Sequence, residues 1–354
     1  MRIGSLAVST CLATVLTIGV ASPASAQFYK QHNLVSDGAV SADLTDPDLV
    51  NAWGLVASAT SPWWVADNGT GKSTLYNGNT GAKLGLVVSV PGAPTGIVFN
   101  GTSGFVIPLH GTARFIFASE DGTISAWSGG TQAFVVADNS ASGAVYKGLA
   151  IGRVGTDSFI YASNFHAGTV DVFDSTFASV TVPGAFHDPT IPAGYAPFGI
   201  QNLGGTIFVT YALQDPTAHD DVAGEGHGFV NAFDTAGNLL RRVASRGALN
   251  SPWGLAQAPA NFGKFSGDLL VGNFGDGRIH AFNPGAGIGE YEDRGPLHST
   301  HGRPIEIDGL WALAFGNGAN AGPVNTLFFT AGPFEEGHGL FGRLDIAGPP
   351  GQDH

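Results

Sequence analysis

The sequence of 354 residues contains one cysteine and one methionine, and both lie within the first 26 residues. This segment has the features of a secretory signal: Arg2 near the start, an apolar stretch over residues 6–20, and the small residues Ala-Ser-Ala at 24–26. The apolar stretch is short and interrupted by Ser and Thr, which argues against a transmembrane helix. We therefore predict a signal peptide at 1–26, cleaved near Ala26, and a secreted or periplasmic mature chain without a membrane span.

Without sulfur after residue 26, the mature chain cannot form disulfides, use a cysteine nucleophile, or bind zinc, iron–sulfur clusters or covalent haem through cysteine. Charge is also scarce, with 15 basic and 28 acidic residues and a net charge of −13. The densest basic cluster is Arg241-Arg242, so nucleic acid is not an expected partner. Residues 66–73 superficially resemble a nucleotide phosphate loop, but they lead into a strand, so no nucleotide site is predicted.

Glycine and hydrophobic residues are abundant. The chain has 53 Gly and 20 Pro, and 43% of its residues are hydrophobic. Frequent glycine and proline disfavour long helices, and the hydrophobic content disfavours disorder. This composition predicts an all-β protein with many turns.

Three sequence elements recur six times in the same order. The first is a Gly-Leu or Gly-Ile pair after a large or polar residue, at 53–55, 95–97, 147–149, 198–200, 253–255 and, with Ala for Gly, 311–313. The second is an apolar strand, at 63–66, 115–118, 159–162, 207–210, 269–271 and 327–329. The third is a strand that starts at a glycine and ends at a polar turn residue, at 71–77, 122–128, 168–174, 228–234, 277–283 and 339–345.

These units recur at intervals of roughly 46 to 62 residues, which is the spacing of propeller blades. Several units also have a fourth strand, for example at 84–90 and 133–137. We predict a six-bladed β-propeller of four-stranded antiparallel blades over 27–346, with a tail at 347–354. The alternative of a β-sandwich does not explain three elements repeated in one order. A strand at 31–36 has no blade of its own, so it is expected to complete blade six and close the ring.

The repeats resemble those of NHL and gluconolactonase-like (SMP-30) six-bladed propellers, mainly in the turns at 65–71 and 161–168. Over about 30–350, the chain more closely resembles an uncharacterised family of exported bacterial proteins, some of which carry a PEP-CTERM sorting tail. The matching segments are 51–55, 250–255, 310–313 and 332–339, although this chain ends in Pro-Gly-Gln-Asp-His without such a tail. The resemblance implies the fold, and fold alone does not transfer an activity.

In a propeller, residues just before the inner strands and just after the second strands surround one mouth of the central channel. The repeat register places eight candidate ligand-binding residues there: Asn51, Trp53, Glu120, Lys147, Asn250, Trp253, Asp308 and Trp311. The three tryptophans occupy one repeat position, so packing between blades is the alternative to a platform for sugars or aromatic ligands.

Two enlarged loops, at 214–226 and 332–339, bring acidic residues and histidines to the same mouth. Carboxylate and imidazole groups can bind a divalent ion, and carboxylate oxygens suit Ca²⁺. Such an ion is the only cofactor expected here. The candidate metal ligands are Asp67, Asn68, Asn164, Asn273, Asp220, Asp221, Glu225, Glu336 and His338. The alternatives are that the Asp and Asn residues cap turns and that the Gly-His-Gly segments are exposed hairpin turns.

Two functions remain open from the sequence. The first is a non-catalytic exported propeller that binds a small molecule, a polysaccharide or a protein at the channel mouth. The second, implied by the gluconolactonase-like resemblance, is a divalent-metal-dependent hydrolase or lyase, with His166, His219 or His227 transferring a proton. The sequence has no Gly-x-Ser-x-Gly or His-Glu-x-x-His motif.

Overall fold

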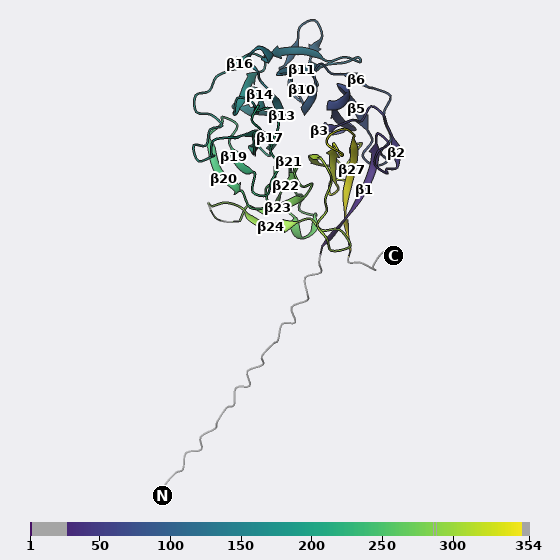
Figure 1. Ribbon diagram of the computed structural model, residues 1–354, viewed down its shortest axis with the longest axis vertical. Helices are drawn as coiled ribbons and strands as arrows, with labels where there is room; N and C mark the ends of the chain where they lie inside the picture. The colour runs from purple at the N-terminus through teal and green to yellow at the C-terminus, as the bar shows by residue number, and fades with distance from the viewer. Residues whose placement is uncertain (2–26, 286, 288, 349–354) are drawn as a thin grey trace.

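The computed structural model describes residues 1, 27–285, 287 and 289–348, and this part of the chain is a six-bladed β-propeller (Figure 1). The fold predicted from the repeats is confirmed. Residues 2–26 of the predicted signal peptide and residues 349–354 of the predicted tail lie outside the described residues. Within the described residues, no helix is long and apolar enough to cross a membrane.

Each blade is an antiparallel sheet whose first strand lies nearest the channel (Figure 1). Blade one contains β3 (Ala52–Val56), β4 (Trp63–Asp67), β5 (Lys72–Tyr76) and β6 (Val88–Ser89). Blade two contains β7 (Pro94–Phe99), β10 (Phe115–Ser119), β11 (Thr123–Trp127) and β12 (Phe134–Asp138), with an extra hairpin of β8 (Val106–Ile107) and β9 (Gly111–Thr112). Blade three contains β13 (Tyr146–Val154), β14 (Asp157–Asn164), β15 (Thr169–Asp174) and β16 (Ser179–Val180).

The second half of the ring repeats this order. Blade four contains β17 (Tyr195–Leu203), β18 (Thr206–Leu213), β19 (Phe229–Phe233) and β20 (Leu239–Ser245). Blade five contains β21 (Pro252–Gln257), β22 (Leu269–Asn273), β23 (Ile279–Asn283) and β24 (Glu292–Pro296). Blade six contains β25 (Leu310–Phe315), β26 (Leu327–Ala331) and β27 (Leu340–Ala347). Three single-turn 3₁₀ helices are η1 (Asn68–Thr70), η2 (Ser140–Ser142) and η3 (Gly263–Phe265).

The N-terminal strand closes the ring, as predicted. β1 (Phe28–Ser36) pairs antiparallel with β27, from Phe28 opposite Ala347 to Ser36 opposite Leu340. β2 (Leu44–Thr45) then pairs with β1 in parallel. The strand starts earlier than the predicted 31–36, and β27 extends into the first residue of the predicted tail. Because the first and last strands share one sheet, the ring has no open seam between blades six and one.

The recurring glycine of the inner strands is required by close packing around the channel. A Cβ added at Gly254 would lie 2.5 Å from the carbonyl oxygen of Trp311 in the next blade. A Cβ at Gly199 would meet the carbonyl oxygen of Trp253 in the same way. A side chain at these positions would therefore push neighbouring blades apart.

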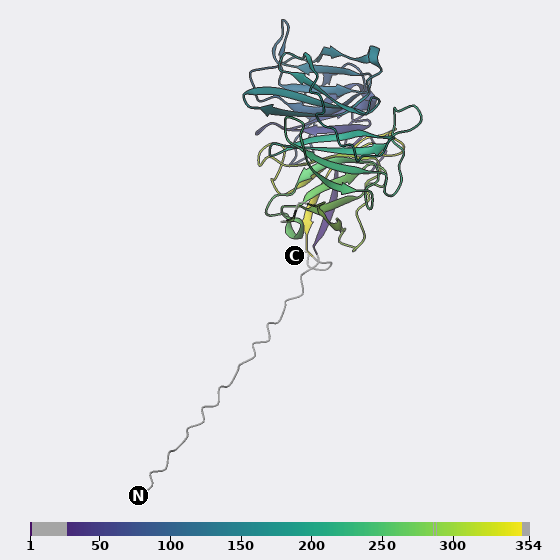
Figure 2. The same cartoon turned by 90° about the vertical axis from the view of Figure 1, so that its left-hand side faces the viewer.

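The hydrophobic core lies between blades and is rich in aromatic residues. Trp64 of blade one stacks on Phe115 of blade two, with ring centroids 3.9 Å apart. Tyr29 of β1 packs on Phe262, which precedes η3 of blade five, at 4.9 Å. Seen from the side, the strands of successive blades lie in layers (Figure 2). Burial of these rings between the blades holds the ring together without disulfides.

Candidate binding site at the polar mouth of the channel

All inner strands start at the same end of the channel, which we call the polar mouth. Asn51 precedes β3 there, and Lys147 is the second residue of β13. The second strands end at the same face, so Asn68 and Glu120, which follow β4 and β10, also reach it. The enlarged loops at 214–226 and 332–339 join the second and third strands of blades four and six.

Side chains from five blades form one continuous hydrogen-bonded chain at the polar mouth. Asn51 Nδ2 donates to Glu336 Oε2 at 2.7 Å and to Asn68 Oδ1 at 3.1 Å. Asn68 Nδ2 donates to Glu120 Oε2 at 2.8 Å. Lys147 Nζ donates to Glu120 Oε1 at 2.5 Å and to Asp220 Oδ1 at 3.0 Å. His219 Nδ1 lies 2.9 Å from the same Asp220 oxygen. We call these seven residues the mouth network: Asn51, Asn68, Glu120, Lys147, His219, Asp220 and Glu336.

Lys147 is the centre of this network and is almost completely buried. Its side chain is 2% exposed, compared with 17% for Glu120 and 67% for Asp220. Burial by itself lowers the pKa of Lys147, but the charges and hydrogen bonds of Glu120 and Asp220 outweigh it, so the pKa is raised and the ammonium stays charged. The ammonium also lies 5.4 Å from the ring centre of Trp53.

The tryptophans form a plug beneath the network and do not form an open platform. Trp53 and Trp311 are stacked with centroids 3.4 Å apart, and Trp253 meets both edge-on at 5.9 and 5.7 Å. All three side chains are buried. Phe274 also stacks on Trp311, with ring centroids 4.1 Å apart. The three tryptophans therefore pack between blades, which was the alternative to a ligand platform. Two of their indole N–H groups also hold residues of the network: Trp311 donates to Asn51 Oδ1 at 3.1 Å, and Trp253 donates to the Lys147 carbonyl at 2.9 Å.

The plug also contains phenylalanines that were not among the predicted site residues. Phe198 packs 5.9 Å from Trp311 and 5.2 Å from Phe165. Phe198 occupies the same repeat position as the tryptophans and Lys147, directly before the recurring glycine, so the repeat could have identified it. Phe165 and Phe274 each follow the Asn that ends a second strand, and only these two of the six units have an aromatic residue at that position.

The loop at 332–339 carries Glu336 to the network through an unusual backbone. Phe334, Glu335 and Glu336 have φ values of 56°, 55° and 62°, a left-handed conformation that costs energy for residues other than glycine. The Asp308 carboxylate stabilises this turn by accepting a hydrogen bond from the Phe334 N–H at 2.8 Å. Burial raises the pKa of Glu336, and the nearby negative charge of Glu120 raises it further.

The loop at 214–226 is held by its own side chains. Asp215 accepts hydrogen bonds from the backbone N–H groups of His219 and Asp220, at 2.9 and 3.3 Å, which places both at the mouth. His227 Nδ1 lies 2.8 Å from the Val222 carbonyl. Burial raises the pKa of Asp221, and one of its carboxylate oxygens has no hydrogen-bond partner within the described residues.

The remaining candidates of these loops lie outside the network. Asn250 Oδ1 accepts the Gly224 N–H at 2.7 Å and so holds the loop at 214–226 against blade five. Glu225 is exposed. His338 Nδ1 lies 2.7 Å from Asp37, next to β1. His166 is exposed and has its ring near Gly143 of blade two.

Asp67, Asn164 and Asn273, predicted as metal ligands, are not part of the network. Asn164 Oδ1 accepts the N–H groups of Val145 and Ala167, so this side chain caps a turn. Asn273 is buried and donates to the Ala248 carbonyl at 2.8 Å. Asp67 is completely buried, and burial raises its pKa well above the usual value. The contacts of Asn164 and Asn273 fit the turn-capping and packing alternative, whereas both carboxylate oxygens of Asp67 are without a hydrogen-bond partner among the described residues.

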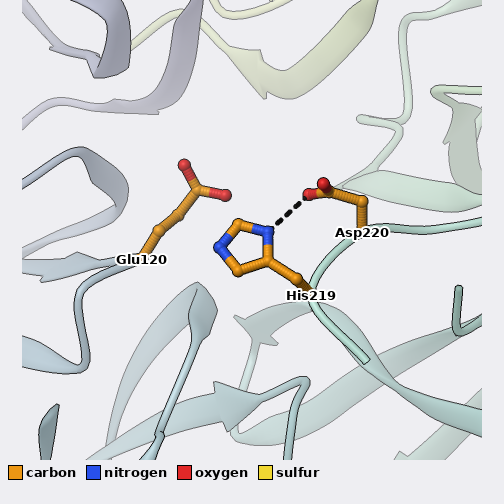
Figure 3. Close-up of side chains that lie close together, drawn as sticks. All are labelled: Glu120, His219 and Asp220. Carbon is orange, nitrogen blue, oxygen red and sulfur yellow. Dashed lines mark hydrogen bonds and ion pairs between the residues drawn. The ribbon is translucent and has the colours of Figure 1, made fainter. Parts of the chain in front are cut away.

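Three potential metal ligands do converge at the mouth. Single ligand atoms of Glu120, His219 and Asp220 all lie within 4.8 Å of one another. Figure 3 shows the three side chains side by side. The Lys147 ammonium, however, already bonds to the same two carboxylates. A divalent ion that used both carboxylates as ligands would have to break these bonds to Lys147, so the three residues do not fit a metal site as they are arranged.

Comparison with known proteins places the chain among viral relatives. It is 34% identical over 334 residues to the uncharacterized protein R648 of Acanthamoeba polyphaga mimivirus, covering 89% of this chain and 80% of the relative. A second mimivirus protein, L690, is also 34% identical, covering 89% of this chain and 85% of the relative. The chain belongs to the same family as these two proteins. No protein-family model matches the chain. These relatives are viral, so they give no support to a bacterial family with a sorting tail.

Solved structures share the fold at low sequence identity. A catalytically inactive virginiamycin B lyase from Staphylococcus aureus with quinupristin has a TM-score of 0.52 at 12% identity, covering 91% of this chain and all of that one. A streptogramin B lyase has a TM-score of 0.51 at 11% identity, covering 92% of this chain and all of that one. At this identity the likeness shows the propeller fold alone.

Proposed function

We propose that this protein is an exported propeller that binds a polar ligand at the polar mouth, through a group that carries positive charge. The observation that carries the proposal is the mouth network, in which residues from five blades converge above the aromatic plug. Buried ion pairs are a weak source of stability, because desolvation offsets most of the attraction between the charges. A hydrogen-bonded network that joins five blades around a buried ion pair is therefore better explained by binding than by stability alone.

The charges of the site favour a cationic ligand group. Glu120 and Asp220 share the ammonium of Lys147, and Glu336 and Asp221 add two carboxyls whose pKa values are raised by burial. Binding of a cation stabilises the ionised form of such carboxyls. Asp220 and His219 are the exposed members, so a ligand would first meet them. An anionic ligand would be repelled by the same carboxylates.

The experiment is a titration with oligosaccharides that differ mainly in charge, at pH 6 and low salt. Short chitosan oligomers carry protonated amines, chitin oligomers are neutral and oligogalacturonides are anionic. We expect only the chitosan oligomers to bind by calorimetry, with affinity that falls as salt is added. Glu120→Gln should weaken binding by about tenfold or more, which corresponds to about 1.4 kcal/mol. Asp157→Asn, in the exposed turn that starts β14, is the matched control. Equal binding of all three oligomers, or equal loss in both variants, would contradict the proposal.

The second candidate, a divalent-metal-dependent hydrolase or lyase, rests on the proximity of Glu120, His219 and Asp220. Metal analysis of the purified protein, combined with thermal melting with and without chelator, separates the two functions. Our proposal expects no stoichiometric metal and an unchanged melt. One bound ion per chain that is lost in Glu120→Gln, together with a lower melting temperature in chelator, would favour the metal-dependent enzyme.

A further inference from the structure

The opposite end of the channel contains a second pocket that the polar mouth does not use. Here the inner strands β3, β17, β21 and β25 end around a cavity of 280 Å³. Its walls are mostly aliphatic and aromatic, and they include Leu55, Trp63, Leu203, Leu255, Leu313 and Phe315. Among the residues that the structure describes, no charged one lines it. We call this cavity the apolar pocket.

The apolar pocket does not continue to the polar mouth. A smaller cavity of 30 Å³ lies deeper in the channel and shares Leu55, Gln201, Leu255 and Leu313 with the pocket. This space holds only one or two water molecules. Trp253 lines its far end, and beyond it lies the aromatic plug. A molecule in the apolar pocket would therefore enter and leave from one side only, independently of any ligand at the polar mouth.

The polar groups of the pocket offer one free hydrogen-bonding side chain. Asn317 Nδ2 donates to the Ser58 and Ser61 carbonyls, both at 2.9 Å. Gln257 Nε2 donates to the Gly267 carbonyl at 2.7 Å. Gln201 is half-buried in β17, and its amide makes no hydrogen bond within the part of the chain that the structure describes. The amide of Gln201 can therefore both donate to and accept from a bound molecule.

We propose that the apolar pocket binds a small, neutral, mainly hydrophobic molecule with one hydroxyl or carbonyl group that bonds to Gln201. The volume sets the size of the ligand. An apolar cavity of about 150 Å³ holds one benzene ring, so 280 Å³ suits about two rings or an aliphatic molecule of similar size. The lining sets its charge, because burying an ion without a partner is costly. Pockets with apolar walls and few polar groups are the usual form of small-molecule sites.

The first test uses 6-propionyl-2-(dimethylamino)naphthalene, a neutral fluorescent probe with two fused rings and one carbonyl group. Trp63 forms part of the pocket wall, so binding should produce energy transfer from tryptophan to the probe. We expect saturable binding at one site per chain. Ala57→Phe, which fills the pocket from the end of β3, should weaken binding by about tenfold or more. Leu203→Phe, on the opposite wall, is a second filling variant in case the first does not fold.

Two controls locate the bound probe. A separate apolar cavity of 170 Å³ lies between blades three and four and is lined partly by Ala236, so Ala236→Phe fills that space instead. Glu120→Gln alters the polar mouth. Both variants should leave probe binding unchanged. The absence of saturable binding, full binding in both filling variants, or loss of binding in Ala236→Phe or Glu120→Gln would overturn the proposal.

The second test concerns the role of Gln201. Naphthalene and 1-naphthol differ by one hydroxyl, and both can be measured by displacement of the probe. Gln201→Leu should weaken binding of 1-naphthol several-fold and leave naphthalene unchanged or bound slightly more tightly. Equal changes for the two molecules would show that Gln201 shapes the pocket without bonding to the ligand, and that part of the proposal would be wrong.

Discussion

Replacing Lys147 with methionine removes one charge from the centre of the mouth network and keeps most of the side-chain volume. The Lys147 side chain is 2% exposed and bonds to Glu120 and Asp220. In Lys147→Met these two carboxylates would face each other without a cation. Because methionine still fills the space beside Trp53, the loss of stability measures the charge and not the packing.

The magnitude follows from the burial of the three partners. Removing one partner of a fully buried ion pair costs about 3 to 5 kcal/mol. Asp220 is 67% exposed, so solvent screens its share of the interaction, whereas Glu120 is largely buried. We therefore expect Lys147→Met to lower the free energy of unfolding by about 2 to 4 kcal/mol at pH 7.

The loss should depend on pH in a defined direction. Burial acts to raise the pKa of Asp220, but the Lys147 ammonium outweighs it and holds that pKa below its usual value. A carboxyl whose pKa is lowered by folding stabilises the folded state at pH values above its pKa in the unfolded chain. This stabilisation is lost as the pH falls through the folded-state pKa and the carboxyl is protonated. The difference between wild type and Lys147→Met should therefore be full at pH 7 and shrink below about pH 4.

The assay is urea unfolding of both proteins between pH 3 and pH 8, with Lys30→Met as the control. Lys30 is exposed on β1 and should change stability by no more than about 0.5 kcal/mol. A double-mutant cycle with Glu120→Gln should give a coupling energy of about 1 kcal/mol or more. A loss in Lys147→Met no larger than in Lys30→Met, or a coupling energy near zero, would refute the role assigned to Lys147.

Two further predictions concern other buried positions. Asp67 is fully buried with its pKa raised, so it stabilises the folded state at low pH and this effect is lost as pH rises. Asp67→Asn should therefore be more stable than wild type at pH 8 by about 1 to 2 kcal/mol, with no gain near pH 3; an equal effect at both pH values in urea unfolding would contradict this. Gly199→Ala should lower the unfolding free energy by at least about 2 kcal/mol, because its Cβ would meet the backbone of β21, whereas Gly129→Ala, which has open space, should have little effect. Equal stability of the two alanine variants would show that the glycine is not required by packing.

The repeat alone was sufficient to predict the blades, because each strand's position depends on local features. A recurring glycine, an apolar strand and a polar turn residue fix where each strand starts and ends. The bounds of β1 and β27 were less well predicted, because the strand pairing between Phe28 and Ala347 joins the two ends of the described chain. No local pattern shows how far such a pairing extends.

The sequence predicted which residues lie near the polar mouth better than it predicted which of their side chains meet. The register correctly placed Asn51, Glu120 and Lys147 around one mouth. It also grouped Asp67, Asn164 and Asn273 with them, but these side chains are not part of the mouth network: Asn164 caps a turn, Asn273 donates to a backbone carbonyl, and Asp67 is completely buried. An Asp or Asn at the end of a second strand has the same sequence position whether its side chain joins the mouth network or lies outside it. Only the direction of the side chain in the folded protein distinguishes the two.

The amino-acid sequence by itself determined the propeller, the number of blades and the face on which the polar residues gather. The tertiary structure decided which of those residues meet. Lys147 and Trp53 occupy the same repeat position, yet one becomes the cation of the network and the other part of the plug. Glu336 reaches Asn51 across 285 residues of sequence through a left-handed turn that Asp308 stabilises. Such contacts depend on how blades one and six lie against each other, because the closed ring fixes the distance that each loop must span.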